Sequence, residues 1–277
     1  MKICGISDIH GNLIENIPKC DVLCICGDIV PLNIQREFYR SIHWWKNRFT
    51  NWINKLNCKK VIIIPGNHDF LLETLWRNNK KNKELNIFKH QLKELTNNKL
   101  EILIDESYYY EGIHFYGTPW INPIEFQENR WAFSSNDHFI NIPKCDILLT
   151  HENPLKNNYL YNNSYGKYKY HFYGHWHDGD SDVNLKCYNC SRLDDHYNFK
   201  KNYKFVILDI MTEKEKKQVE QEFLDSLINE AHNTHPDIEE WLSAYKVINL
   251  PQDKEDEVEW NTSAEILDSA VINDMED

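Results

Sequence analysis

The feature that most constrains this chain is a set of short apolar runs, each followed at once by side chains that can bind metal ions or protons. The sharpest example is the run at 61–64, Val-Ile-Ile-Ile, which precedes Pro-Gly-Asn-His-Asp at 65–69. A short β-branched run bounded by Pro and Gly is typical of a buried strand that ends abruptly. Strand ends carry the chemistry in α/β proteins. The pattern therefore predicts a site at Asn67 and His68.

Four further apolar runs end in the same way. The runs are residues 2–7, 21–26, 145–149 and 170–173. In that order they are followed by Asp8 and His10, by Asp28, by His151, and by His175 and His177. Because the carboxyl ends of parallel strands meet at one edge of a sheet, we expect these side chains to converge. Asp8 and His10 flank a single apolar residue, so an extended backbone would project both to the same side.

The converging groups are carboxylates, imidazoles and one amide, without a thiolate. Borderline divalent ions such as manganese, iron, zinc and nickel accept this donor set. Seven ligands exceed what one ion takes from a protein while leaving room for substrate, so we expect two ions. The seven candidate ligands are Asp8, His10, Asp28, Asn67, His151, His175 and His177.

These motifs resemble the five sequence blocks of the calcineurin-like metallophosphoesterase superfamily. The blocks are Asp8-x-His10, Gly27-Asp28, Gly66-Asn67-His68-Asp69, His151 and Gly174-His175-x-His177. They occur in order and cover roughly residues 1–210. The resemblance implies an α/β core of two stacked mixed β-sheets flanked by helices. It also implies a two-metal centre, with Asp8, His10 and His177 on one ion, Asn67, His151 and His175 on the other, and Asp28 bridging them.

The same resemblance assigns His68 to the substrate, where it protonates or hydrogen-bonds the leaving oxygen. Asp69 is expected either to orient His68 or to cap the helix that begins near residue 71. The implied reaction is hydrolysis of a phosphate ester by a metal-activated hydroxide. Manganese is the leading expectation for both metals, with iron, zinc or nickel as alternatives.

Departures from the superfamily pattern narrow the range of expected substrate classes. Protein Ser/Thr phosphatases continue the second block as Gly-Asp-x-Val-Asp-Arg-Gly, whose Arg contacts phosphate, whereas this chain reads Ile-Val-Pro-Leu-Asn at 29–33. Arg130 or Arg192 could replace that phosphate contact, because arginine binds phosphate through two hydrogen bonds. The alternative is that both are ordinary surface residues. The stretches at 117–120 and 131–133 are similar to a branch that includes animal metallophosphoesterase-domain proteins and bacterial class III cyclic-nucleotide phosphodiesterases.

We therefore expect a phosphodiesterase acting on a cyclic nucleotide or a short oligonucleotide. A phosphomonoesterase or protein phosphatase is the first alternative. A binding protein that keeps the fold without catalysis is the second, since a fold does not secure an activity. Such a non-catalytic protein is expected to lack one or more metal-binding residues, whereas all seven candidate ligands are present in this chain.

Charge is distributed unevenly between residues 1–210 and the acidic residues 211–277. The 277 residues carry a net charge of -12, but residues 211–277 hold nineteen Asp and Glu against five Lys, which leaves about +2 on residues 1–210. A nearly neutral body without a basic stripe disfavours a duplex nucleic-acid partner. We expect a phosphoesterase domain over 1–210, a helical extension over 211–250 that packs on it, and an acidic tail over 251–277. The tail either binds a protein partner or only solubilises the chain.

The location expected from the sequence is the cytoplasm. No run approaches the roughly 18 apolar residues of a membrane helix. The first residues are typical of a strand rather than a signal peptide. The eight cysteines lie mostly inside apolar runs, which indicates buried thiols in a reducing compartment rather than a disulfide framework.

An internal repeat bears on the fold. Residues 16–23 and 141–148 differ at one position of eight, and each leads an apolar run toward a candidate ligand. We expect two halves built alike with the site at their junction, and a chance match is the alternative. A helix is expected over about 36–56, and strands of the second sheet are expected at 100–104, 108–110 and 113–116.

Overall fold

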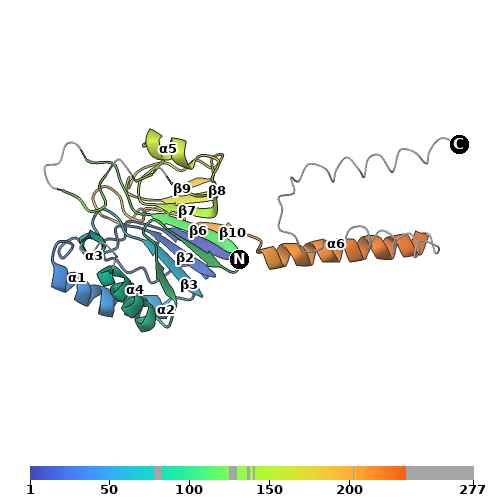
Figure 1. Cartoon of the computed structure of the whole chain (residues 1–277), viewed down its shortest axis with the longest axis horizontal. Helices are drawn as coiled ribbons and strands as arrows, with labels where there is room; N and C mark the ends of the chain where they lie inside the picture. The colour runs from blue at the N-terminus through green and yellow to red at the C-terminus, as the bar shows by residue number, and fades with distance from the viewer. Residues whose placement is uncertain (78–82, 125–129, 136–137, 140, 202, 235–277) are drawn as a thin grey trace. The chain divides into compact units, whose positions relative to one another are not determined.

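The computed structural model describes residues 1–77, 83–124, 130–135, 138–139, 141–201 and 203–234 (Figure 1). The chain divides into two compact units, Met1–Lys217 and Gln218–Asp277. The helix α6 (Glu213–Thr234) begins in the first unit and is all that is described of the second. The predicted tail over 251–277, and the part of the predicted helical extension beyond residue 234, lie outside the described residues.

The first sheet collects the apolar runs of the N-terminal half. Its strand order is β10-β1-β2-β3-β4, with β10 antiparallel at one edge and the others parallel. Strands β2 and β3 are buried along their whole length, as expected for parallel strands covered on both faces. The bounds are β1 (Lys2–Ile6), β2 (Val22–Cys26), β3 (Lys60–Ile64), β4 (Leu100–Ile102) and β10 (Val206–Asp209).

Helices cover the outer face of this sheet (Figure 1). They are α1 (Phe38–Trp44), α2 (Thr50–Lys55), α3 (Phe70–Arg77) and α4 (Lys83–Leu95). The helix predicted over 36–56 is present from Phe38 to Lys55, with a π-helical segment, η1 (Trp45–Phe49), between α1 and α2. Trp45 and Phe49 are fully buried, so the apolar stripe of this segment faces the core as expected.

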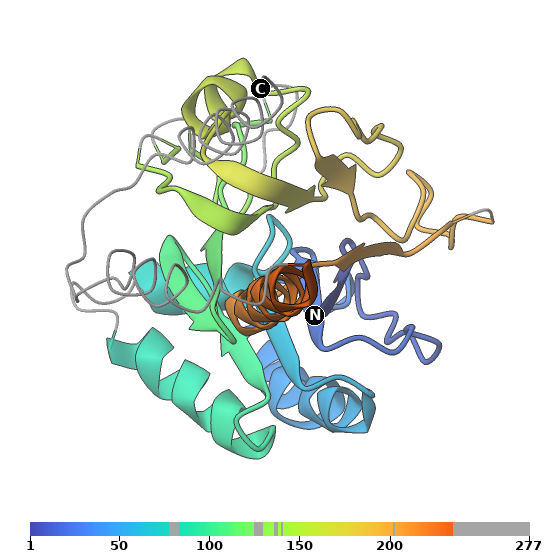
Figure 2. The ribbon, with the colours of Figure 1, turned by 90° about the vertical axis from the view of Figure 1, so that its right-hand side faces the viewer.

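The second sheet has the same plan. Its order is β5-β6-β7-β8-β9, with β5 antiparallel at one edge and the other strands parallel. The helix α5 (Asn158–Ser164) lies on the side of this sheet that faces away from the first (Figures 1 and 2). The bounds are β5 (Glu106–Tyr110), β6 (Ile113–Thr118), β7 (Cys145–Thr150), β8 (Tyr168–Tyr173) and β9 (Cys187–Asn189).

One strand was predicted in the wrong sheet. Residues 100–104 were expected in the second sheet, but β4 pairs in parallel with β3, with Val61 opposite Leu100. Helix α4 precedes β4, and a helical crossover is how one parallel strand returns beside another. The apolar run alone does not say which neighbour it pairs with.

The two sheets pack face to face through a continuous apolar layer. Val22, Cys24 and Cys26 of β2 enter the same cluster as Ile147 and Leu149 of β7. The two copies of the repeated octapeptide lead into β2 and β7, and each of these strands takes the middle position of its sheet. The predicted fold class, two stacked mixed sheets flanked by helices, is confirmed. Within the described residues no helix is both long and apolar enough to cross a membrane.

Candidate metal centre

The centre of the site is the carboxylate of Asp28, which follows β2. His151 Nε2 lies 3.3 Å from its Oδ1, and the Nε2 atoms of His10 and His68 lie 3.6 and 3.7 Å from its Oδ2. All four side chains are buried. One carboxylate after the middle strand of the first sheet therefore faces three imidazole nitrogens from three other loops.

A second group shares His10 with the first. His177 Nε2 lies 3.6 Å from Asp8 Oδ1 and 3.4 Å from His10 Nε2. Ligand atoms from Asp8, His10 and His177 all lie within 4.8 Å of one another. The first and last of the predicted sequence blocks thus meet, although 167 residues separate His10 from His177.

The remaining candidate ligands lie on the other side of Asp28. Asn67 Oδ1 is 2.9 Å from His151 Nε2. The ring of His175 lies 5.1 Å from the ring of His151, centroid to centroid, and its backbone N–H donates to both oxygens of Asp8. The structure therefore brings together all seven predicted ligands. It also groups His68 with His10 and Asp28, whereas the sequence placed His68 off the metals.

The loop backbone differs from the extended form that the sequence suggested for Asp8 and His10. Their φ angles are +53° and +42°, and Asp28 and His175 also have positive φ, +54° and +67°. Such left-handed residues cost roughly 1–3 kcal/mol each and cluster at functional sites. The reason is a tight loop pairing: Asp8 N–H donates to the Gly27 carbonyl, and His10 N–H to the Asp28 carbonyl.

Two glycines allow these loops to approach one another. A Cβ at Gly66 would lie 2.3 Å from Asp28 Oδ1 and 2.7 Å from His151 Nε2. A Cβ at Gly174 would lie 2.4 Å from Asp8 Oδ2. A glycine directly before a candidate ligand is thus a readable signal, because any side chain there would occupy the space between the ligands.

Charge in the centre is unevenly distributed. Burial opposes ionisation of Asp28, but the charges of His68 and His151 outweigh it and hold the Asp28 pKa well below its usual range. Burial likewise opposes protonation of His151, yet Asp28 raises the pKa of His151 to about 10. For His10 burial dominates and lowers its pKa to about 4. At neutral pH His10 therefore presents unprotonated nitrogen to its neighbours.

The donor set fits a divalent cation. His10 Nε2 and His177 Nε2 face each other at 3.4 Å, so without a proton between them two lone pairs oppose each other. His10 Nδ1 is buried and has no hydrogen-bond partner in the described part of the chain, which is rare for a buried polar atom. A cation beside Asp8, His10 and His177 would satisfy nitrogen and carboxylate lone pairs at once.

Contacts behind the ligands set their orientation. His151 Nδ1 donates to the Cys26 carbonyl (2.7 Å), and His177 Nδ1 donates to the Asp194 carbonyl (2.8 Å). Ser191 Oγ donates to Asp8 Oδ2 (2.6 Å). With Nδ1 engaged, both imidazoles direct Nε2 into the centre, which is the usual arrangement of metal-binding histidines.

The hydrogen bonds of Asp69 differ from the expectation that it orients His68. Its carboxylate accepts from the backbone N–H groups of Ile29, Val30 and Gly66. Its backbone carbonyl accepts from Glu73 N–H in the first turn of α3, so the residue stands at the helix start while its side chain ties the second and third ligand loops together. Burial raises the pKa of Asp69 to about 7.

Gln35 lies beside His68, the position that one of the two sequence expectations gave to Asp69. His68 Nδ1 donates to Gln35 Oε1, from a loop 33 residues away. Burial lowers the pKa of His68. No motif marked Gln35, because a lone glutamine in a loop carries no spacing signal.

The arginines considered as phosphate contacts are engaged elsewhere. Arg130 pairs with Glu73 at 2.8 Å, and Glu73 is 4 % exposed. The guanidinium of Arg192 lies 3.7 Å from the Tyr203 ring centroid and 4.5 Å from that of Phe205. Both contacts are structural: the first anchors the loop at 130–133 and the second anchors the segment after β9.

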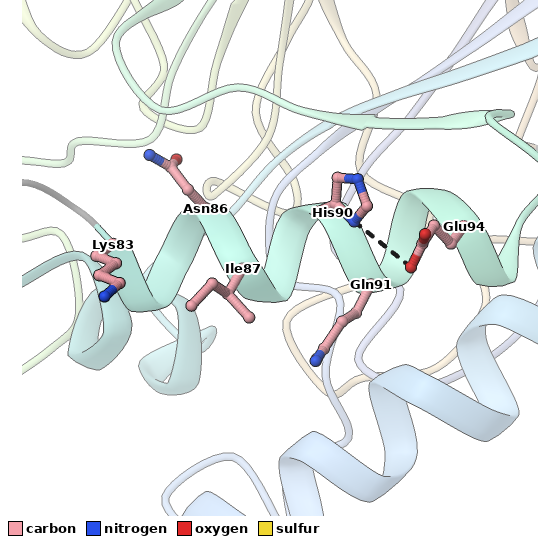
Figure 3. A pocket seen from close by; sticks show the side chains of 6 residues that line it. All are labelled: Lys83, Asn86, Ile87, His90, Gln91 and Glu94. Carbon is pink, nitrogen blue, oxygen red and sulfur yellow. Dashed lines mark ion pairs between the residues drawn. The ribbon is translucent and has the colours of Figure 1, made fainter.

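A hollow lies along α4 (Figure 3). The residues that line it all belong to that helix, and its one ion pair joins His90 Nδ1 to Glu94 Oε2 at 3.4 Å. Figure 3 shows the side chains spread along one helix face. The hollow does not gather groups from separate elements, so it offers no comparable constellation.

Two stacked mixed sheets with buried carboxylates and imidazoles at the strand ends define a metallohydrolase of the two-sheet α/β class. Residues 1–179 match the family model described as calcineurin-like phosphoesterase, and the chain belongs to this family. Membership supports metal-dependent hydrolysis of a phosphoester.

Other comparisons add little. A search of curated proteins finds no match. One solved structure, from work described as the characterisation of a novel archaeal phosphodiesterase, is 18% identical and has a TM-score of 0.35. The match covers 75% of this chain and 100% of that one. A similarity of this size carries no argument about substrate.

Proposed function

We propose that this protein is a two-metal phosphodiesterase that hydrolyses a cyclic nucleotide or a short oligonucleotide. The observation that carries the proposal is the Asp28 carboxylate between two ligand groups. Its Oδ2 faces His10, which lies beside His177, and its Oδ1 faces His151, which lies beside Asn67. Asp8 has ligand atoms within 4.8 Å of those of His10 and His177 and also of those of Asp28 and His151. A carboxylate that faces both groups is suited to bridge two cations.

The ligand assignment follows this geometry. Asp8, His10 and His177 would hold one ion, and Asn67, His151 and His175 the other. Manganese is the proposed metal, with iron, zinc or nickel compatible with the same donors. When bound, two such ions neutralise charge on the phosphate oxygens and provide a nucleophile from water at neutral pH.

His68 is the proposed catalytic residue. With Nδ1 held by Gln35, the atom that can exchange a proton with the leaving oxygen is Nε2. The nearby Asp28 carboxylate, 3.7 Å from Nε2, stabilises the protonated ring, and burial opposes it. Asp69 supports this step indirectly, because its carboxylate holds Gly66 N–H in the loop that carries His68.

The engaged arginines favour a diester over a monoester. A phosphomonoester dianion carries more charge than a diester and gains more from a bidentate arginine. Of the two candidates from the sequence, Arg130 pairs with Glu73, and the Arg192 guanidinium lies against the Tyr203 ring, with Nε and Nη1 buried and without a hydrogen-bond partner in the described part of the chain. A phosphomonoesterase or protein phosphatase is the alternative that the experiment below separates.

The deciding experiment compares bis-p-nitrophenyl phosphate with p-nitrophenyl phosphate, using protein purified with manganese. We expect a higher kcat/KM for the diester, and loss of turnover in Asp28→Ala and His151→Ala. Preference for the monoester would replace the proposal with the alternative. Full activity in either variant would refute a metal-dependent mechanism at this centre.

Two further assignments complete the proposal. The cytoplasm is the proposed compartment, supported by eight free cysteines, seven of them buried. The acidic tail over 251–277 is proposed to bind a basic protein partner, supported by its sequence charge alone, with solubilisation as the alternative. If the tail instead shields the site, deleting residues 253–277 lowers KM at low ionic strength, since repulsion of an anionic substrate is screened by salt.

A further inference from the structure

A row of aromatic rings crosses the metal centre. Ring centroids are 4.6 Å apart for Trp131 and His68, 4.8 Å for His68 and His10, and 5.0 Å for His10 and Tyr197. The two inner rings belong to the centre itself. The two outer rings, Trp131 and Tyr197, come from different loops and stand at opposite ends of the row.

Tyr197 is held over the centre by its loop. Its ring also lies 5.4 Å from that of His177, yet the residue is 43% exposed. Its φ is +62°, an uncommon conformation for a bulky residue. The Asp194 carboxylate accepts from the N–H groups of His196 and Asn198, and the Asp194 carbonyl holds His177. The same short loop thus orients a ligand and places an accessible ring beside it.

The family match ends at residue 179, before Asp194. An aromatic ring left accessible at such a position is not explained by core packing, because large rings gain most from burial. It is explained if a further planar group covers it.

Trp131 is the counterpart at the His68 end. Its ring lies 6.0 Å from that of Phe70, and the guanidinium of Arg36 lies 5.3 Å from its centroid. The neighbouring Arg130 pairs with the buried Glu73, so the loop is fixed on both sides of the tryptophan. Trp131 is half-buried, so part of its side chain remains accessible.

We propose that Trp131 and Tyr197 are specificity-determining walls that stack planar groups of the ester, which makes a nucleoside-bearing phosphodiester the substrate class. The inference rests on the proposed function, which it deepens. Every nucleobase has a π face, and stacking of a base on an aromatic side chain is sequence-tolerant. The walls therefore select for a base without selecting which base.

The test measures equilibrium binding by calorimetry, with the full chain purified with manganese. Adenosine 5′-monophosphate and ribose 5-phosphate present the same phosphate with and without a base. We expect the wild type to bind the nucleotide at least about fivefold more tightly. Tyr197→Leu and Trp131→Leu should each weaken nucleotide binding roughly 5- to 150-fold and leave ribose 5-phosphate unchanged. Tyr197→Phe keeps the ring and should keep the affinity.

The matched control is Tyr109→Leu. Tyr109 is 67% exposed and stacks on His114 at 4.3 Å, on β5, so it reproduces an exposed tyrosine on a histidine outside the centre. This variant should bind both ligands as the wild type does. Equal affinity of the wild type for the two ligands, or equal loss of both in Tyr197→Leu, would overturn the inference.

Turnover of bis-p-nitrophenyl phosphate reports separately on the proposed function. If the protein hydrolyses the diester but binds the two ligands equally, the stacking role of Trp131 and Tyr197 is refuted and the phosphodiesterase activity is supported. If Tyr197→Leu abolishes base-dependent binding but the protein hydrolyses no diester, the stacking role is supported and the proposed phosphodiesterase activity is refuted.

Discussion

The two sheets share one plan but contribute different chemistry to the centre. Each has four parallel strands and one antiparallel edge strand, and each has a copy of the octapeptide leading into its middle strand. The loops of the first sheet supply both candidate carboxylates, the amide and one imidazole: Asp8, Asp28, Asn67 and His10. The loops of the second supply imidazoles, His151, His175 and His177. A shared scaffold therefore does not dictate shared ligands.

Each half also orients the ligands of the other. The Cys26 carbonyl of the first sheet holds His151, and the His175 N–H and Ser191 hydroxyl of the second half hold Asp8. The first half thus carries the negative charge, and the second half carries donors that stabilise it. Neither half holds all the candidate ligands, so substitutions in the two halves should have different effects.

The largest effect should come from removing charge in the first half. Asp28→Asn keeps the shape but takes away the carboxylate that faces three imidazoles, and we expect kcat/KM for a diester to fall about 10³-fold or more. Metal content by mass spectrometry should fall with it. Asp209→Asn, at a carboxylate 70% exposed on the same sheet, is the control and should be neutral. Retention of a tenth of the activity would contradict the charge asymmetry.

A second effect should come from protonation of a buried histidine in the second sheet. His171 of β8 is fully buried and accepts from or donates to Thr150 Oγ1 at 2.7 Å, and burial lowers its pKa to about 3. Since histidine in the unfolded chain has its ordinary pKa of 6.5, stability present above pH 6.5 is lost as the pH falls toward 3.

For one proton the slope approaches about 1.4 kcal/mol per pH unit inside that window. Urea unfolding of wild type and His171→Gln between pH 4 and 7 checks this: the variant should lose up to that slope. His90→Gln, at an exposed histidine on α4, is the matched control and should keep the wild-type slope. Equal slopes in wild type and His171→Gln would rule out a neutral buried His171.

The next effect concerns the junction of the halves. Gly66→Ala places a methyl group against Asp28 Oδ1 and His151 Nε2, so we expect about 1–3 kcal/mol of destabilisation together with weaker metal binding. Gly166→Ala is the control: its φ is +74°, but a Cβ there meets nothing within 4 Å. It should cost about 1 kcal/mol of backbone strain and leave metal binding intact. Denaturant midpoints and metal titration separate the two variants.

The smallest effect tests the repeat itself. The two octapeptides differ where the first has Val22 and the second has Ile147, and both side chains are fully buried between the sheets. Ile147→Val makes the second copy identical to the first and should cost about 0.5–1.5 kcal/mol through one lost methylene group. Activity should not change, because the residue packs away from the centre. A measurable fall in kcat would show that the inter-sheet layer positions His151.

What the sequence alone determined is the chemistry of the centre and the class of fold. A donor directly after a buried strand is a local pattern, so Asp8, Asp28, Asn67 and His151 could be named before any contact was known. Gly27, Gly66 and Gly174, which directly precede Asp28, Asn67 and His175, are local signals too. Strand burial and helix periodicity are also local patterns, so individual strands and helices could be predicted from short stretches of sequence. The stacking of two sheets was expected from the resemblance to the superfamily.

Only the tertiary structure decided which residues from distant segments are in contact. Residues 100–102 joined the first sheet because a helical crossover returned them beside β3, and an apolar run does not name its partner. Gln35 rather than Asp69 met the His68 ring because Asp69 was taken by three backbone N–H groups. The left-handed turns at Asp8 and His10 arose from pairing with a distant loop. Periodicity records burial, and contacts between segments far apart depend on how the whole chain packs.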